Sequence, residues 1–240
     1  MSAGSASERR ASARSAVVWD ALDTPLASDQ PLDVLDIGGG TGGSAVRIAQ
    51  LGHRVSVVDS SPDALAALAR RAREAGVQVT AQQGDLADLL DVVAPASVDL
   101  VLCHGVLEVV DDSAAALAGI RTVLRPGGTL SLLVAQRTSA VLVRAMAGHF
   151  GQAKALLDDT SPLGRSGRRF TQDEAAAALS EAGFAVTAVH GVRVFADLVP
   201  GSLLDLEPGA SQALVELEQA VAQRADYLPL ATQLHFTARR

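Results

Sequence analysis

A run of glycines near the start of the chain is the stretch whose residue types and spacing are best suited to chemistry. From Val34 to Gly43 the sequence reads VLDIGGGTGG, a short apolar segment that stops at the glycines. Glycines adopt positive φ and let the backbone approach a ligand closely. The predicted helix from Ser44 to Leu51 would direct its unpaired N–H groups to the same place. We therefore expect a cofactor to bind where the predicted strand from Leu32 to Ile37 meets this turn.

The spacing of these glycines fits two classes of cofactor site. Gly38, Gly40 and Gly43 match the dinucleotide fingerprint GxGxxG, in which an acid about 20 residues further on binds ribose. Read with Asp36 before Gly38, Gly40 and Gly42, the same turn resembles the first motif of the class I S-adenosylmethionine-dependent methyltransferases. These residues alone support the two interpretations about equally.

Polar side chains stand at the carboxyl ends of the next predicted strands, namely Asp59, Asp85 and His104. Ligands of open α/β sheets bind at this edge. We therefore expect Asp59 to bind ribose hydroxyls and Asp85 to accept an adenine amine, with Gly84 keeping the backbone clear of the ring. The structural alternatives are a plain loop acid for Asp59, the cap of a short helix for Asp85 and a buried structural histidine for His104.

Composition bounds the class of protein. The chain has 240 residues, 48% hydrophobic content and a mean hydropathy of +0.24, which favours a single α/β domain. No run approaches the roughly 18 apolar residues of a membrane span, and residues 1–14 are not followed by a signal-type apolar core. The single cysteine, Cys103, argues against an internal disulfide and a cysteine-based metal site. We expect a cytoplasmic protein without a metal.

Predicted strands and helices alternate through the first 135 residues, and right-handed crossovers wind such a pattern into a parallel sheet. A helix from Ala6 to Leu22 precedes this pattern. After residue 170 a helix begins at Thr171 with a capping box to Glu174. Two further strands, 184–195 and 233–238, are predicted to pair as an antiparallel hairpin at the edge of the sheet.

The charged residues are unevenly distributed. The formal net charge of −7 argues weakly against a nucleic-acid partner. However, residues 137–169 hold six basic and two acidic side chains, whereas residues 197–226 hold six acidic and one basic. We divide the single predicted domain, 1–240, into an N-terminal helical segment 1–30, a core, a basic insert 137–170 and an acidic helical insert 196–231, and expect the two inserts to form a substrate cap.

Motifs across the whole chain resemble one methyltransferase family. They are HGVLE from His104, LRPGGTLS from Leu124, MAGHF from Met146, GVRVFAD from Gly191 and HFTAR from His235. Together they are similar to the bacterial tRNA 5-carboxymethoxyuridine methyltransferases, which esterify the carboxylate of a modified wobble uridine. The resemblance implies a Rossmann-like α/β fold with seven strands, mostly parallel with an antiparallel C-terminal strand, and helices on both faces. It also implies S-adenosyl-L-methionine as cofactor, S-adenosyl-L-homocysteine as product and tRNA as a possible partner.

The same resemblance implies which residues contact the cofactor. The family roles fall on Arg14, Gly38, Gly39, Asp59, Gly84, Asp85 and His104, and the glycine motif adds Asp36 and Gly40. Arg14 would reach the methionine carboxylate, although its place on a predicted helix also fits a solvent-exposed charge.

The acceptor is less clearly specified. A carboxylate acceptor is ionised at neutral pH and needs a cation to orient it, for which we consider Arg193, Arg144 and Arg169. An amine or hydroxyl acceptor would instead need a base, with His149 as the first candidate. The acidic balance and the aromatic content of 3% favour a small-metabolite methyltransferase of the same fold as the nearest alternative. A nicotinamide-dependent oxidoreductase or a non-catalytic cofactor-binding protein is the alternative from another class.

Overall fold

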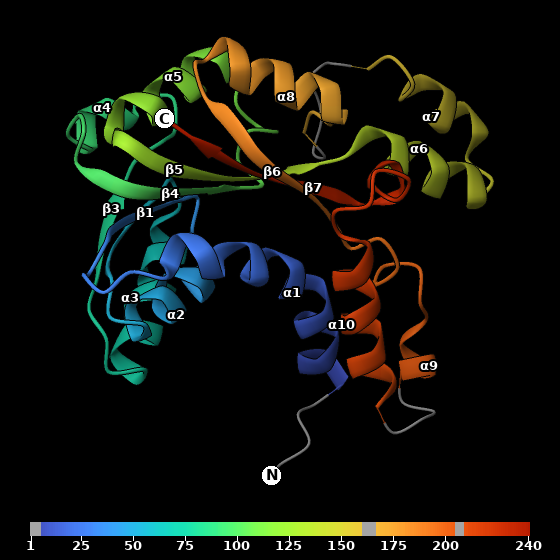
Figure 1. The fold of residues 1–240 in the computed structure, drawn as a ribbon, viewed down its shortest axis with the longest axis horizontal. Coiled ribbons are helices and arrows are strands. Elements are labelled where there is room, and N and C mark those ends of the chain that lie inside the picture. The colour runs from blue at the N-terminus through green and yellow to red at the C-terminus, as the bar shows by residue number, and fades with distance from the viewer. Residues whose placement is uncertain (1–5, 160–166, 205–208) are drawn as a thin grey trace.

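The computed structural model describes residues 6–159, 167–204 and 209–240. In these residues one seven-stranded sheet runs through the molecule (Figure 1) in the order β3-β2-β1-β4-β5-β7-β6. The strands are β1 Asp33–Ile37, β2 Arg54–Asp59, β3 Val79–Gln83, β4 Val98–His104, β5 Leu124–Ala135, β6 Ala185–Val192 and β7 Gln233–Arg239.

The pairing confirms the predicted sheet. Strands β3, β2, β1, β4 and β5 are joined by parallel pairs, while β7 is antiparallel to both β5 and β6. The strand order reverses between β1 and β4, which is where ligands bind in open α/β sheets. The carboxyl ends of β1, β2, β3 and β4 therefore define one ligand-binding edge.

Helices cover both faces of the sheet (Figure 1). One face is covered by α1 Ala6–Leu26, α2 Gly43–Gln50, α3 Pro62–Glu74 and α10 Ala210–Val221, and the other by α4 Leu89–Val92, α5 Ser113–Val123 and α8 Gln172–Glu181. Beyond the end of β5 lie α6 Arg137–Met146 and α7 Phe150–Ala155, and the short 3₁₀ helix η1 Leu228–Leu230 contacts α6 and β6. Helix α9 Gly201–Leu204 lies beside α10. Two buried apolar clusters, one on each face, hold these layers together.

Several predicted helix boundaries are confirmed by their caps. The Ser61 hydroxyl accepts a hydrogen bond from the Ala64 N–H at the start of α3, next to Pro62. At α8, Thr171 and Glu174 form the predicted capping box in both directions.

Other boundaries differ from the predictions for identifiable reasons. Helix α1 continues past Leu22 because Leu26, one turn later, is also buried against the sheet. Strand β5 begins at Leu124 instead of Thr129, and the turn between them bulges out where the register with β4 shifts. Strand β6 ends at Val192 instead of Phe195, because the Glu218 carboxylate accepts the N–H groups of residues 194–196 and removes them from the sheet.

Within the described ranges no helix is long and apolar enough to cross a membrane. The same residues contain no group of three or more histidine, cysteine, aspartate or glutamate side chains arranged to hold a metal ion.

Candidate cofactor and acceptor site

The turn after β1 has a backbone that only glycine suits. Gly38 has φ +66° and donates its N–H to the Val58 carbonyl at 2.8 Å. A Cβ on Gly38 would lie 2.4 Å from a methyl group of Val106. Gly40 and Gly42 also have positive φ, at +54° and +78°. The glycine run is therefore required by close packing as well as by backbone conformation.

Asp59 ties this turn to the end of β2. One carboxylate oxygen accepts the Gly40 N–H at 2.9 Å and the other accepts the Ser61 N–H at 2.8 Å. Each oxygen keeps a lone pair for a further donor. The arrangement holds the carboxylate in a fixed orientation from which it can accept ribose hydroxyls.

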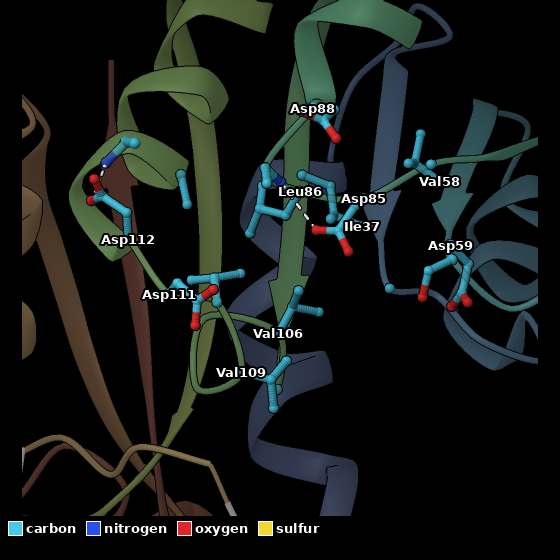
Figure 2. A pocket seen from close by; sticks show the side chains of 18 residues that line it. Ile37, Val58, Asp59, Asp85, Leu86, Asp88, Val106, Val109, Asp111 and Asp112 are labelled. Atoms are coloured by element: carbon cyan, nitrogen blue, oxygen red, sulfur yellow. Dashed lines mark hydrogen bonds between the residues drawn. The ribbon is translucent and has the colours of Figure 1, made fainter. Parts of the chain in front are cut away.

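A cavity of about 560 Å³ opens at this edge of the sheet (Figure 2). Four of the predicted cofactor residues line it, namely Gly38, Asp59, Gly84 and Asp85. Figure 2 shows Asp59 and Asp85 coming from neighbouring strand ends, and apolar side chains such as Val106 and Val109 lining the same cavity. Apolar walls with a few fixed carboxylates suit a planar base and its sugar.

Asp85 does not cap α4 with its side chain. Its carboxylate accepts the Ala87 N–H at 3.1 Å, and the residue at the cap position, Asp88, makes no side-chain cap bond. Gly84 donates its N–H to the Asp59 carbonyl at 3.2 Å, and a Cβ there would press on Val58 and Val92 at 3.2–3.3 Å. The short loop thus keeps Asp85 beside the cavity and its backbone close to the wall.

Asp36 and Gly39 lie behind the cavity lining. The Asp36 side chain is buried, and a Cβ on Gly39 would come within 2.6 Å of its carboxylate. Burial, and to a lesser degree the charge of Asp59, raises the pKa of Asp36 to about 7. Asp36 therefore supports the turn from beneath, and any contact that it makes with a cofactor stays a prediction.

His104 ends β4 as predicted, but its imidazole is directed across the sheet. Its Nε2 lies 2.8 Å from the Ser131 hydroxyl, which in turn lies 2.7 Å from Nε2 of His235. Burial lowers the pKa of His104 to about 4, so the ring is neutral at neutral pH. Gly105 and Val106, not His104, line the cavity. The sequence could not show this orientation, because it depends on which side chains the neighbouring strands supply.

Arg14 and Arg193 share one carboxylate. Asp197 Oδ1 lies 2.9 Å from Arg14 Nη2, and Asp197 Oδ2 lies 2.5 Å from Arg193 Nη2. Arg193 also donates to the Gln233 side chain at 3.2 Å. The structure thus brings together one predicted cofactor residue and one predicted acceptor residue, around an acid that the sequence does not single out as a site residue.

The remaining acceptor candidates lie in the basic insert. Burial, followed by the nearby charge of Arg144, lowers the pKa of Arg169. Arg144 donates to the Ala140 carbonyl within its own helix at 3.4 Å. His149 is exposed and stands at the start of α7, where its backbone N–H donates to the Arg144 carbonyl. Part of this insert, residues 160–166, lies outside the described residues, as do residues 205–208 of the acidic insert.

Two buried glutamates have roles that the sequence did not reveal. Glu218 is fully buried and accepts three consecutive backbone N–H groups, from Val194 to Ala196, at 2.7–2.9 Å. Glu108 accepts the Ala135 N–H at 2.8 Å, and burial raises its pKa. For Glu218 a signal was available, because it lies on the helix face that buries Leu214 and Val221.

Comparisons with known proteins agree with this geometry. Residues 34–128 match a family described as a methyltransferase domain. The chain is 33% identical over 236 residues to the tRNA 5-carboxymethoxyuridine methyltransferase of Escherichia coli (strain K12), and the match covers 95% of this chain and 88% of the relative. The chain belongs to the class I S-adenosylmethionine-dependent methyltransferases. Because the match covers 95% of this chain, it extends beyond residues 34–128 into both inserts of this chain.

Two further comparisons show what the methyltransferase shares with more distant proteins. The ubiquinone biosynthesis O-methyltransferase of Xanthomonas campestris pv. campestris (strain B100) is 35% identical, but over only 115 residues, or 48% of each chain. The magnesium protoporphyrin IX methyltransferase of Synechocystis PCC 6803, solved with bound S-adenosylhomocysteine, superposes with a TM-score of 0.62 at 17% identity, covering 100% of this chain and 89% of that one. The methyltransferase family identifies S-adenosylmethionine as the cofactor, in place of a nicotinamide.

Proposed function

We propose that this methyltransferase esterifies the carboxylate of a modified wobble uridine in tRNA. The observation that carries the proposal is the extent of the similarity to the E. coli tRNA enzyme, which spans 95% of the chain. The similarity to the ubiquinone-pathway enzyme stops at 48%. Because cofactor-binding segments are common to the whole fold class, a substrate is better inferred from a relative that also matches the two inserts.

The cofactor-binding residues that we propose are those predicted from the sequence. Gly38, Asp59, Gly84 and Asp85 line the cavity directly. Gly39, Gly40 and Asp36 build the turn behind it, and His104 supplies the strand end from which the lining residues Gly105 and Val106 follow.

The chemistry demands positioning more than acid–base catalysis. S-adenosylmethionine supplies a methyl group on an activated sulfonium leaving group. A carboxylate acceptor is already ionised, so no proton has to be removed from it. Holding the acceptor oxygen in line with the methyl group in a dry site can contribute up to about 7–11 kcal/mol in favourable cases. His149 therefore has no basic role in this proposal, in agreement with its exposed position.

Arginine is the side chain best suited to orient the acceptor carboxylate, because its planar fork matches two oxygens. Arg193 follows β6, which runs parallel to β5, so it lies at the edge of the sheet where β4 and β5 also end. Arg144 and Arg169 form a second group of positive charge at α6 and the segment before α8. We propose Arg193 for the acceptor carboxylate and the Arg144 and Arg169 pair for the RNA backbone.

The basic insert carries features that suit an RNA partner. Helices α6 and α7 expose large apolar side chains, including Met146 and Phe150, each 70% exposed. An exposed aromatic ring beside cations is a platform for an unstacked base. We propose that inserts 137–170 and 196–231 form the substrate cap, and that a tRNA acceptor places the reaction in the cytoplasm.

A small-molecule acceptor is the second candidate. The net charge of −7 and the aromatic content of 3% favour it, because single-stranded RNA is usually held by cations and stacked aromatic rings.

Transfer of labelled methyl from S-adenosylmethionine separates these two candidates. The acceptors are tRNA carrying 5-carboxymethoxyuridine, the same tRNA with unmodified uridine, and a small-molecule extract. We expect label only in the first, released by mild base as expected for a methyl ester. Label confined to the small-molecule fraction would replace the tRNA proposal with the second candidate.

A further inference from the structure

A second cavity, of about 390 Å³, lies between helices α1 and α10, which run side by side (Figure 1). No residue lines both this cavity and the cofactor cavity. The rest of its lining is valine and alanine, including Val17 and Ala220, and its polar side chains are Asp20, His190, Gln219, Gln223 and Arg224. The cavity therefore offers hydrogen-bond donors and acceptors between small apolar walls.

His190 is the buried member of this cavity, with 8% of its surface exposed. Its Nε2 lies 2.7 Å from Nε2 of Gln223. Because an amide nitrogen only donates, the ring accepts there and carries its proton on Nδ1. Burial lowers the pKa of His190, although the His235 backbone and the charge of Asp20 oppose that shift, so the ring is neutral at neutral pH. No hydrogen bond of good geometry from the described residues reaches Nδ1.

The two charged side chains of the cavity do not pair with each other. Asp20 Oδ2 accepts the Gln219 side-chain amide at 2.6 Å, which leaves Oδ1 for another donor. No hydrogen bond or ion pair joins the Arg224 guanidinium to any other residue in the described ranges. An acid and an arginine that line one cavity without pairing leave room for a ligand that contacts both.

The spacing of these groups suits a fused two-ring base. Gln219, which contacts Asp20, and Arg224 are five residues apart. Helix α10 ends at Val221, and the Arg224 N–H donates to the Val221 carbonyl at 2.9 Å in one further tight turn. The helical rise then separates the two positions by about 7–9 Å. A purine with its exocyclic groups spans a gap of this size.

The order of donors and acceptors favours guanine over adenine. Guanine presents O6 and N7 as acceptors and its N2 amine as a donor, and an arginine fork is the commonest partner of O6 and N7. A carboxylate such as that of Asp20 accepts the amine. Adenine carries an N6 amine in place of O6, which would direct a donor at the guanidinium of Arg224.

The cavity lies at the same level of the sheet as the cofactor edge. His190 pairs with His235, and both His235 and His104 pair with Leu133. These residues therefore form one row across β4, β5, β7 and β6, and three strand spacings separate His190 from His104 by about 14 Å. A nucleic acid that reaches the cofactor edge can reach this row as well.

We propose that the cavity between α1 and α10 is a second base site, which binds guanine with Arg224 on O6 and N7 and Asp20 on the N2 amine. Two sources supply this chemistry, a free guanine nucleotide and an unstacked guanine of an RNA bound to the methyltransferase. Only the RNA source rests on the proposed function.

The test uses the full chain saturated with S-adenosylhomocysteine, so that a nucleotide cannot enter the cofactor cavity. Calorimetry then measures binding of three probes, guanosine, inosine and adenosine 5′-monophosphate. We expect saturable binding of guanosine monophosphate, about fivefold weaker binding of inosine monophosphate, which lacks the N2 amine, and at least about tenfold weaker binding of adenosine monophosphate. Absence of saturable guanosine monophosphate binding, or equal affinity for adenosine monophosphate, overturns the proposal.

A matched pair of substitutions on α10 tests the location. Ala220 lines the cavity and Ala213 does not, while both are exposed. Ala220→Phe fills the cavity and should weaken guanosine monophosphate binding at least about tenfold, whereas Ala213→Phe should leave it within about twofold. Equal affinities in the two variants contradict the assignment.

A second pair, on α1, tests the contact with the amine. Asp20→Asn should remove most of the preference for guanosine over inosine monophosphate, because the carboxylate accepts the N2 amine. Asp23→Asn, an exposed acid on the same helix outside the cavity, should keep that preference. An unchanged preference in Asp20→Asn contradicts the proposed orientation of the base.

Methyl transfer to tRNA carrying 5-carboxymethoxyuridine distinguishes the two sources. If the base belongs to the RNA, guanosine monophosphate competes with tRNA, and Ala220→Phe raises the KM for tRNA about fivefold over Ala213→Phe. Equal KM values identify a free nucleotide as the source. If tRNA proves not to be the acceptor, the binding of guanosine monophosphate still decides whether the base site exists.

Discussion

The two ends of the ligand-binding edge are built in different ways. At the cofactor end, the cavity is lined by residues that directly follow β1, β2, β3 and β4, and the fixing contacts are backbone N–H groups such as that of Gly40. At the proposed acceptor end, beyond β5, the fixing contacts join side chains from distant parts of the chain, as Asp197 does with Arg14. The position of the cofactor residues is determined by the strand order of the sheet. The position of the residues beyond β5 is determined by contacts between individual side chains. Substitutions should therefore affect the two ends differently.

The largest effect is expected at the acceptor end, from Glu218→Leu. The leucine fills similar space but leaves three buried N–H groups, from Val194 to Ala196, without an acceptor. We expect a loss of about 3–5 kcal/mol in the free energy of unfolding. Urea unfolding measures it.

The matched control for Glu218→Leu is Glu216→Leu on the same helix. Glu216 is exposed, and its carboxylate accepts a hydrogen bond from the exposed Gln212 side chain at 3.1 Å. Its substitution should change stability by less than about 0.5 kcal/mol. Equal effects of the two substitutions would mean that the N–H groups find other partners and that the Glu218 contacts do not stabilise this end.

At the cofactor end, the next largest effect is expected from Gly42→Ala. A Cβ there would lie 2.1 Å from a Leu68 methyl group, at a φ of +78°. Positive φ costs about 1–2 kcal/mol and overpacking adds about as much, so a loss of about 3 kcal/mol is expected. Gly52 has φ +94° and open space within 4 Å of the position that a Cβ would take, so Gly52→Ala should cost only about 1 kcal/mol. Thermal unfolding of both variants measures the difference, since Gly52→Ala adds only backbone strain and Gly42→Ala adds backbone strain and a steric clash with Leu68.

The same contrast explains what the sequence could predict. The glycine turn, Asp59 and Asp85 were found because a strand end is visible as a local pattern, and parallel pairing then places strand ends together. The antiparallel final pair was found from the order of the elements.

The sequence did not predict the roles of residues whose orientation depends on a partner far away in the chain. The orientation of His104 depends on Ser131 and His235, and the hydrogen bond between those two joins residues 104 positions apart. Likewise the early end of β6 depends on Glu218, which a pattern within β6 itself cannot reveal. Local periodicity carries no information about such pairs.

Cofactor affinity directly tests the residues at the cofactor end. Asp59→Asn keeps the size of the side chain but removes the charge and one acceptor for the Gly40 and Ser61 N–H groups. We expect S-adenosylhomocysteine to bind about tenfold more weakly, or ~1.4 kcal/mol, as measured by calorimetry. Asp63→Asn, an exposed acid in the first turn of α3, is the control and should leave affinity within about twofold. Unchanged affinity in Asp59→Asn would remove Asp59 from the proposed site.

The smallest net effect is expected from the pair of His104 and Asp36 as the pH changes, because burial shifts their pKa values in opposite directions. Burial lowers the pKa of His104 from 6.5 to about 4, so an unfolded chain takes up this proton first and stability is lost as pH falls below 6.5. Burial raises the pKa of Asp36 from 3.8 to about 7, so the folded chain holds that proton and stability is gained as pH falls from 7 towards 4. Between pH 6.5 and 4 the contributions of these two groups should largely cancel each other.

Single substitutions separate these slopes. In Asp36→Asn the gain disappears, so its unfolding free energy should fall relative to the unaltered protein by about 1 kcal/mol per pH unit between pH 6.5 and 5. In His104→Gln the unfolding free energy should rise relative to the unaltered protein as the pH falls, because the destabilisation that comes from His104 is removed. Urea unfolding at pH 7, 6 and 5 gives both differences, in which titrating groups that interact with neither side chain cancel. Parallel curves for all three proteins would show that neither group changes its proton affinity on folding, and that the turn at Asp36 and the histidine contacts across the sheet are more open to water than their burial indicates.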